Sequence, residues 1–131
     1  MAEEIRVLAW AAVLLLVHIF SAIHFKTRQY GVDWNTGARD ETMPPLNPVA
    51  GRLERARDNF LETLPIALIA LFGVVLADKA NAASALGAWI WLGARTVYLF
   101  VYWAGIPKLR TLIYFVSLIG LSMAIWPLLA G

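Results

Sequence analysis

The sequence predicts an all-α integral membrane protein, an up-and-down bundle of four transmembrane helices in one domain, 1–131. Hydrophobic residues make up 60% of the 131 residues, and the mean hydropathy is +0.67, above the usual balance of a soluble domain. Four apolar runs each approach the roughly 20 residues that a spanning helix needs. The connections between the second and third runs and between the third and fourth are short, so consecutive helices should be antiparallel.

The expected helices cover residues 5–25, 51–77, 82–104 and 108–129. The first has no basic residues before it and no small-residue cleavage site after it, so it is expected to be a retained helix and not a signal peptide. Residues 26–50 are rich in Gly, Pro, Asp and Asn, a composition typical of an irregular loop.

Composition also excludes several function classes. The absence of Cys excludes disulfides, thiolate metal sites and a protein-borne thiol nucleophile. A net charge of +2 is too small to indicate nucleic acid as a partner. His18 and His24 in the first helix are interpreted as single packed or hydrogen-bonded residues, so no metal site is predicted.

Basic residues indicate the orientation in the membrane. Most of them lie in the long loop, at the start of the second helix and in the third connection: Lys26, Arg28, Arg39, Arg52, Arg55, Arg57, Lys108 and Arg110. The other side carries only Arg6 and Lys79. The positive-inside rule therefore places the loop 26–50 in the cytoplasm and both chain ends on the non-cytoplasmic side.

A polar stripe begins the second helix. Its purely apolar part, Leu64 to Ala77, is only about 14 residues long and cannot cross roughly 30 Å of hydrocarbon. The polar positions Arg52, Arg55, Asn59 and Glu62 must then lie at or near membrane depth, and their spacing of 3, 4 and 3 places them on one helical face. Because charge facing lipid is costly, this face is expected to point into protein or a water-filled pocket.

Two further helices present polar faces on the same side of the membrane. One face of the third helix carries Trp91, Arg95, Tyr98 and Tyr102, and the start of the fourth carries Arg110, Tyr114 and Ser117. By helical rise, Glu62 and Arg95 both lie roughly 15 to 17 Å below the cytoplasmic helix ends, so they are expected to pair. Three helices thus converge polar groups in the cytoplasmic half of the bundle.

The chemistry of these side chains indicates a small zwitterionic peptide as ligand. Arginine pairs with carboxylates, a buried glutamate favours an ammonium group, and an asparagine amide suits a peptide bond. For a ligand with a thiol, Arg110 at a helix N-terminus supplies a cation for the thiolate. Simpler interpretations stay open: a purely structural Glu62–Arg95 pair, snorkelling arginines, and tyrosines that belong to an interfacial belt or the core.

The run RxxRAxxNxxExxP, here Arg52 to Pro65, resembles the second-helix signature of the MAPEG superfamily, membrane-associated proteins in eicosanoid and glutathione metabolism. RTVYLFVY, PKLR and Tyr114 resemble its third and fourth helices, so the resemblance covers essentially the whole chain. It implies a homotrimer that binds glutathione between neighbouring subunits, on the cytoplasmic side. It places these residues in that site: Arg55, Asn59, Glu62, Tyr98, Tyr102 and Arg110.

The resemblance also implies roles. Arg110 matches the arginine that activates the glutathione thiol, and we take Tyr102 as a second catalytic candidate. Arg52, Arg95 and Tyr114 join the glutathione-binding candidates through their shared helical faces, and Arg28 or Lys26 is a stand-in for a basic residue that the family uses in its first loop. The long loop, with YGVDW and GARDE, is similar to bacterial members, which indicates a bacterial inner membrane.

The expected function is that of a glutathione transferase or glutathione-dependent peroxidase, similar to the microsomal glutathione transferases. Its second substrate would be a lipophilic electrophile or lipid hydroperoxide that arrives through the lipid bilayer. A non-catalytic member of the same fold, acting in membrane assembly or interaction, is the main alternative. A drug/proton antiporter is disfavoured because residues 7–25 contain no acidic side chain.

Overall fold

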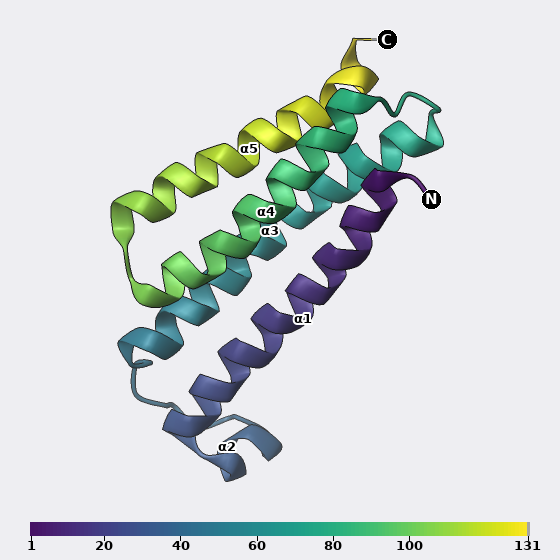
Figure 1. Cartoon of the computed structure of the whole chain (residues 1–131). Coiled ribbons are helices and arrows are strands. Elements are labelled where there is room, and N and C mark those ends of the chain that lie inside the picture. Colours follow the sequence, from purple (N-terminus) through teal and green to yellow (C-terminus); the bar gives the residue numbers. More distant parts are fainter. Residues whose placement is uncertain (131) are drawn as a thin grey trace.

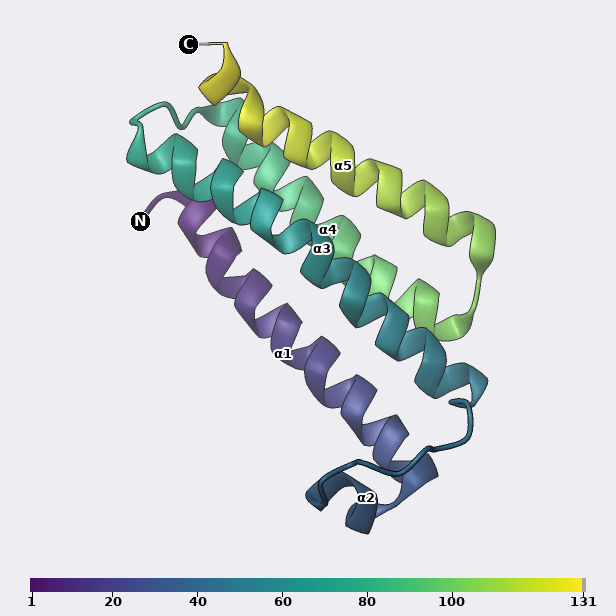
Figure 2. The same cartoon turned by 180° about the vertical axis from the view of Figure 1, so that it is seen from behind.

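Four long helices pack side by side in the computed structural model, which describes residues 1–130 (Figures 1 and 2). They are α1 (Glu3–Tyr30), α3 (Pro48–Leu76), α4 (Ala82–Ala104) and α5 (Pro107–Leu129), and a short α2 (Val32–Thr36) follows α1. Each of the four is long and apolar enough to cross a membrane. The expected all-α architecture is confirmed.

The bundle has two distinct ends (Figure 1). Both chain termini and the α3–α4 turn lie at one end, and the α1–α3 connection and the α4–α5 turn lie at the other, which we call the loop end. Helices α3 and α4 are central, since each contacts the other three long helices. The loop end therefore brings together the end of α4 and the starts of α3 and α5.

Local signals in the sequence explain where these helices begin and end. The Asn47 side chain accepts a hydrogen bond from the Ala50 backbone N–H at 2.9 Å and caps α3, and Asn81 and Ser84 form a reciprocal capping box at the start of α4. Gly105 ends α4 in the left-handed conformation with φ 77, and Pro107 begins α5, the preferred positions of these two residue types.

The segment 26–50 is only partly the irregular loop that its composition predicts. Helix α1 continues to Tyr30, α2 occupies Val32–Thr36, and α3 already begins at Pro48. Tertiary contacts hold these extra turns: Lys26 pairs with Glu54 of α3 at 3.0 Å, and Asn35 Nδ2 donates to Thr27 Oγ1 at 2.8 Å. Specific side-chain contacts of this kind, one of them 28 residues apart in the sequence, are invisible to local composition.

Helices α4 and α5 approach most closely at two glycines. A Cβ added to Gly87 would overlap the carbonyl oxygen of Gly120, and one added to Gly120 would lie 2.6 Å from the carbonyl oxygen of Gly87. Small residues that allow backbones to touch are a common device of helix packing in membranes. This contact fixes α5 against α4 and thereby sets where the first turn of α5 lies.

Candidate functional site

A basic pocket lies at the loop end of the bundle. It has a volume of about 220 Å³ and is lined by Arg52, Arg55, Tyr102, Gly105, Ile106, Pro107 and Arg110. The lining holds three guanidinium groups and no carboxylate. Such a pocket favours an anionic ligand, because arginine binds carboxylates through paired hydrogen bonds.

Tyr102 lies between two of these arginines. Its hydroxyl accepts a hydrogen bond from Arg55 Nε at 3.1 Å. The guanidinium carbon of Arg110 lies 4.9 Å from the Tyr102 ring centroid, and that of Arg55 lies 5.9 Å away, both within reach of a cation–π contact. The ring thus holds one cation on its face and the other at its hydroxyl.

Arg110 is held in the first turn of α5, where Pro107 begins the helix. One of its terminal nitrogens donates to the Tyr98 hydroxyl at 3.3 Å. At this position the unpaired backbone N–H groups of the helix start add partial positive charge to that of the guanidinium. The arrangement can stabilise an anion that forms in the pocket.

Arg52 contributes to the fold as well as to the pocket. Its Nε donates to the carbonyl oxygen of Trp103 at 3.1 Å, one of the last carbonyls of α4 that has no partner within the helix. A Cβ on Gly105 would lie 3.3 Å from the Arg52 guanidinium carbon. The small, left-handed Gly105 therefore gives Arg52 the space to reach the end of α4.

Arg95 lies beneath the pocket and is fully buried. Its guanidinium carbon is 4.3 Å from the ring centroid of Tyr98 and 5.5 Å from those of Phe60 and Tyr114. Among residues 1–130, none of its three side-chain nitrogens has a hydrogen-bond partner. The cation is thus stabilised by aromatic faces, and Tyr98 links it to Arg110 above.

Comparison with known sequences now identifies the chain. The sequence model of the MAPEG family matches residues 7–130, nearly the whole length. The chain belongs to the MAPEG family. Neither the curated proteins nor the solved structures gave a match. Membership confirms the family prediction, and together with the four membrane-spanning helices it makes the chain an integral, multi-pass membrane protein.

The polar face of the MAPEG motif in the second helix does not point into the core of a single chain. The fully buried row of α3 is formed by Ala56, Phe60 and Ala67. Arg55, Asn59 and Glu62 form the neighbouring row, one position earlier along the helix, which is rotated outward by about 100°. As a result Arg55 lines the pocket, Asn59 is half-buried with an unpartnered Oδ1 atom, and Glu62 is exposed.

The predicted ion pair between Glu62 and Arg95 is therefore wrong within one subunit. Glu62 makes no ion pair among the described residues, and Arg95 faces Phe60 instead. Equal depth in the membrane is necessary for Glu62 and Arg95 to pair, but their side chains must also face each other. Because Phe60 occupies the inward position of α3, it takes the place expected for Glu62.

The remaining candidates fall into two groups. Tyr98 is fully buried and Tyr114 half-buried, with ring centroids 6.0 Å apart, so both lie around Arg95 below the pocket. Arg28 lies apart from the basic pocket, exposed on α1, and lines a separate groove. The structure thus brings together seven of the ten predicted residues around Tyr102 and Tyr98: Arg52, Arg55, Arg95, Tyr98, Tyr102, Arg110 and Tyr114.

Sequence reasoning missed several residues that shape this region of the MAPEG fold. Phe60 stacks between the rings of His18 and Trp91, with centroids 5.0 and 5.8 Å away, and it supports Arg95. Gly105 makes room for Arg52. The Gly–Ile–Pro sequence after α4 was the available signal for a tight helix end, whereas nothing in the sequence distinguishes Phe60 from an ordinary core residue.

Proposed function

We propose that this MAPEG protein is a membrane-bound glutathione transferase or glutathione-dependent peroxidase, with glutathione as co-substrate. Family membership by itself is consistent with glutathione-related or eicosanoid metabolism. The observation that carries the proposal is the position of Arg110, in the first turn of α5 and inside a pocket with two further arginines. This is a site for a small anionic molecule with a group that ionises beside Arg110.

Glutathione fits the chemistry of this site. Its two carboxylates suit Arg52 and Arg55, and its thiol, placed at Arg110, would lose a proton to solvent and remain as thiolate. In the transferase reaction the thiolate sulfur forms a bond to an electrophilic carbon and the leaving group departs with its electron pair. The protein then contributes charge stabilisation and the proximity of two bound reactants.

The roles of the other residues follow from their contacts. Tyr102 keeps Arg55 in place through its hydroxyl and is the second group near the reacting sulfur. Tyr98 orients Arg110, while Arg95 and Tyr114 support Tyr98 from below. Asn59 and Glu62 would contact the peptide bond and the ammonium group of glutathione.

A second copy of the chain would complete this site, in line with the homotrimer that the family resemblance implies. The pocket of about 220 Å³ is smaller than the roughly 300 to 1,000 Å³ usual for ligand sites. Glu62 is exposed on a helix that spans the membrane, and a charge facing lipid is unfavourable. A neighbouring subunit that covers this face of α3 would enlarge the pocket and shield Glu62.

A lipophilic electrophile or lipid hydroperoxide would reach the thiolate through the bilayer between subunits. The excess of basic side chains at the loop end favours a cytoplasmic location for the pocket, where glutathione is available. The bacterial inner membrane, with both termini on the non-cytoplasmic side, is the matching location.

The proposal is tested by titrating the purified protein in detergent with glutathione and with an analogue that has a methyl group in place of the thiol. Both should bind, and only glutathione should support turnover of an aryl halide or a lipid hydroperoxide. Binding without turnover of either class would favour a non-catalytic, ligand-binding member. Failure of both ligands to bind would contradict the proposal and favour an assembly or interaction protein.

A further inference from the structure

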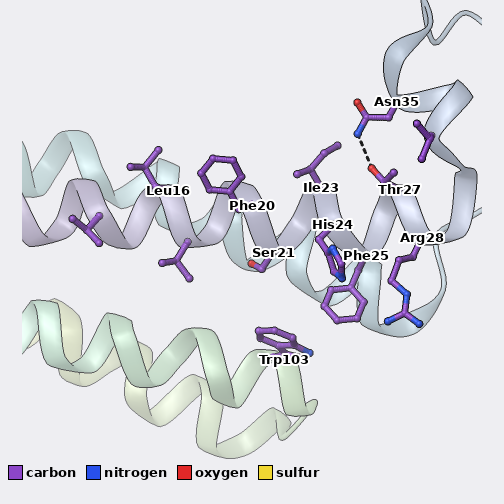
Figure 3. A pocket seen from close by; sticks show the side chains of 13 residues that line it. Leu16, Phe20, Ser21, Ile23, His24, Phe25, Thr27, Arg28, Asn35 and Trp103 are labelled. Atoms are coloured by element: carbon purple, nitrogen blue, oxygen red, sulfur yellow. Dashed lines mark hydrogen bonds between the residues drawn. The ribbon is translucent and has the colours of Figure 1, made fainter.

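A large groove lies on the outside of the bundle, separate from the basic pocket. It has a volume of about 950 Å³ and lies between the second half of α1, the short α2 and the end of α4 (Figure 3). Its walls are mainly apolar, with Val17 and Phe20 on α1 and Trp103 on α4. The proposed function does not use this groove.

One end of the groove carries an uncompensated positive charge. Arg28 lines the groove, is exposed, and makes no ion pair among residues 1–130. The nearby Lys26, by contrast, pairs with Glu54 at 3.0 Å. Figure 3 shows Arg28 beside His24 and Phe25 at the loop end of the groove, with the apolar walls extending away from them.

The length of the groove matches one leaflet of a bilayer. Along α1 it runs from Val13 to Arg28, which corresponds to about 22 Å of helix. Half of a bilayer with its headgroups measures roughly 20 to 22 Å. Arg28 therefore lies at the depth of the headgroups when the apolar walls lie at the depth of the acyl chains.

We propose that this groove is a binding site for one anionic glycerophospholipid of the bilayer. An acyl chain lies along Phe20 and Trp103, and the phosphate and the negatively charged headgroup lie at Arg28. The apolar walls account for binding of a lipid tail, whereas the unpaired guanidinium accounts for headgroup selectivity. One basic side chain near an anionic headgroup corresponds to a preference of about fivefold.

The test measures how many lipids the purified protein retains. The detergent-solubilised assembly is equilibrated with equal amounts of phosphatidylglycerol and phosphatidylcholine with identical acyl chains, and retained lipids are counted by native mass spectrometry. We expect about one phosphatidylglycerol per chain, preferred over phosphatidylcholine by about fivefold. Arg28→Gln should abolish the preference while some lipid of both kinds is retained.

A matched control removes the same charge from the other end of the same helix. Arg6 is also exposed on α1 but lies far from the groove, so Arg6→Gln should keep the preference for phosphatidylglycerol. Trp103→Ala, which removes a wall of the groove, should lower retention of both lipids. Arg28→Lys should largely restore the preference lost in Arg28→Gln.

Several results would overturn the proposal. Equal retention of the two lipids by the unmodified protein would show that Arg28 does not select a headgroup, and equal losses in Arg6→Gln and Arg28→Gln would point to net charge alone. Retention of no lipid would indicate that another copy of the chain covers the groove. A loss of glutathione affinity in Arg28→Gln with unchanged lipid selectivity would assign Arg28 to the co-substrate instead.

Discussion

At the scale of single residues, Tyr102 has the most contacts with the arginines of the basic pocket. Tyr102→Phe removes the hydroxyl that accepts from Arg55 and leaves the ring beneath Arg110. Because Arg55 is exposed, the lost hydrogen bond should cost only about 1 kcal/mol, so glutathione affinity should fall about fivefold. Titration calorimetry measures the change.

Tyr30→Phe is the matched control, since the Tyr30 hydroxyl donates to the Pro44 carbonyl oxygen in the α1–α3 connection and lies outside the basic pocket. Its glutathione affinity should equal that of the unmodified protein. Equal glutathione affinities of the unmodified protein, Tyr102→Phe and Tyr30→Phe would show that the Tyr102 hydroxyl does not contribute to glutathione binding.

Arg95 is buried at a cost in free energy, because its guanidinium group lacks hydrogen-bond partners among the described residues. Arg95 contacts the ring of Tyr98, and the Tyr98 hydroxyl accepts a hydrogen bond from Arg110, so the charge of Arg95 lies close enough to act on the pocket above. With a separation on the order of 10 Å and an effective dielectric constant of about 20, that charge should favour the thiolate by roughly tenfold. Arg95→Met should thus lower turnover about tenfold while thermal stability stays within a few degrees of its original value.

Arg95→Lys keeps the charge and should recover part of the turnover. Thermal unfolding measured in parallel with initial rates separates an electrostatic role of Arg95 in turnover from a structural role in stability. A fall in stability that accompanies the loss of turnover in both variants would make Arg95 a purely structural residue.

At the scale of elements, the glycine contact between α4 and α5 makes a clear prediction. Gly87→Ala inserts a methyl group against the Gly120 backbone, so it should lower the free energy of unfolding by about 1 to 3 kcal/mol. Gly93→Ala, on the same helix with no atom within 4 Å of the added Cβ, should be neutral or stabilising by up to about 1 kcal/mol. Denaturation in mixed micelles measures the free energy of unfolding of both variants.

Because α5 carries Arg110, Gly87→Ala should also weaken glutathione binding, whereas Gly93→Ala should not. Equal stabilities of the two variants would show that α4 and α5 do not pack through the glycine contact.

The sequence predicted these elements well where the signal is local. Hydropathy and the short connections located α4 and α5 to within a residue, and the caps at Asn81, Gly105 and Pro107 explain why the helices begin and end there. The end of α1 and the short α2 were not predicted, because they depend on specific side-chain contacts, Lys26 with the distant Glu54 and Asn35 with Thr27. For the site, the expected convergence of polar faces from three helices agrees with the contact between Arg55 and Tyr102. Helical spacing did not resolve which row of α3 faces inward, and so the Glu62 pairing was wrong within one subunit.

At the scale of the whole molecule, the exposed Glu62 would connect the proposed glutathione site to the proposed assembly. If a second subunit covers it, Glu62→Gln should lower glutathione affinity by roughly tenfold or more through loss of a charge-assisted hydrogen bond. The variant should still elute as a trimer, because the substitution preserves side-chain volume. Light scattering in detergent measures the assembly size, and titration with glutathione measures the affinity. Together they distinguish an intact trimer with weakened binding from a variant that has dissociated into subunits and lost binding for that reason.

In the proposed reaction, Arg110 holds the sulfur of glutathione as a thiolate. The most direct measurement is the ultraviolet absorbance of the thiolate, recorded as glutathione is added to the purified protein at neutral pH. The unmodified protein should produce this absorbance, Arg110→Lys should retain part of it, and Arg110→Ala should lose it while glutathione binding weakens much less. An undiminished thiolate signal in an Arg110→Ala protein that still assembles would contradict this role of Arg110 and assign thiolate stabilisation to another group of the site.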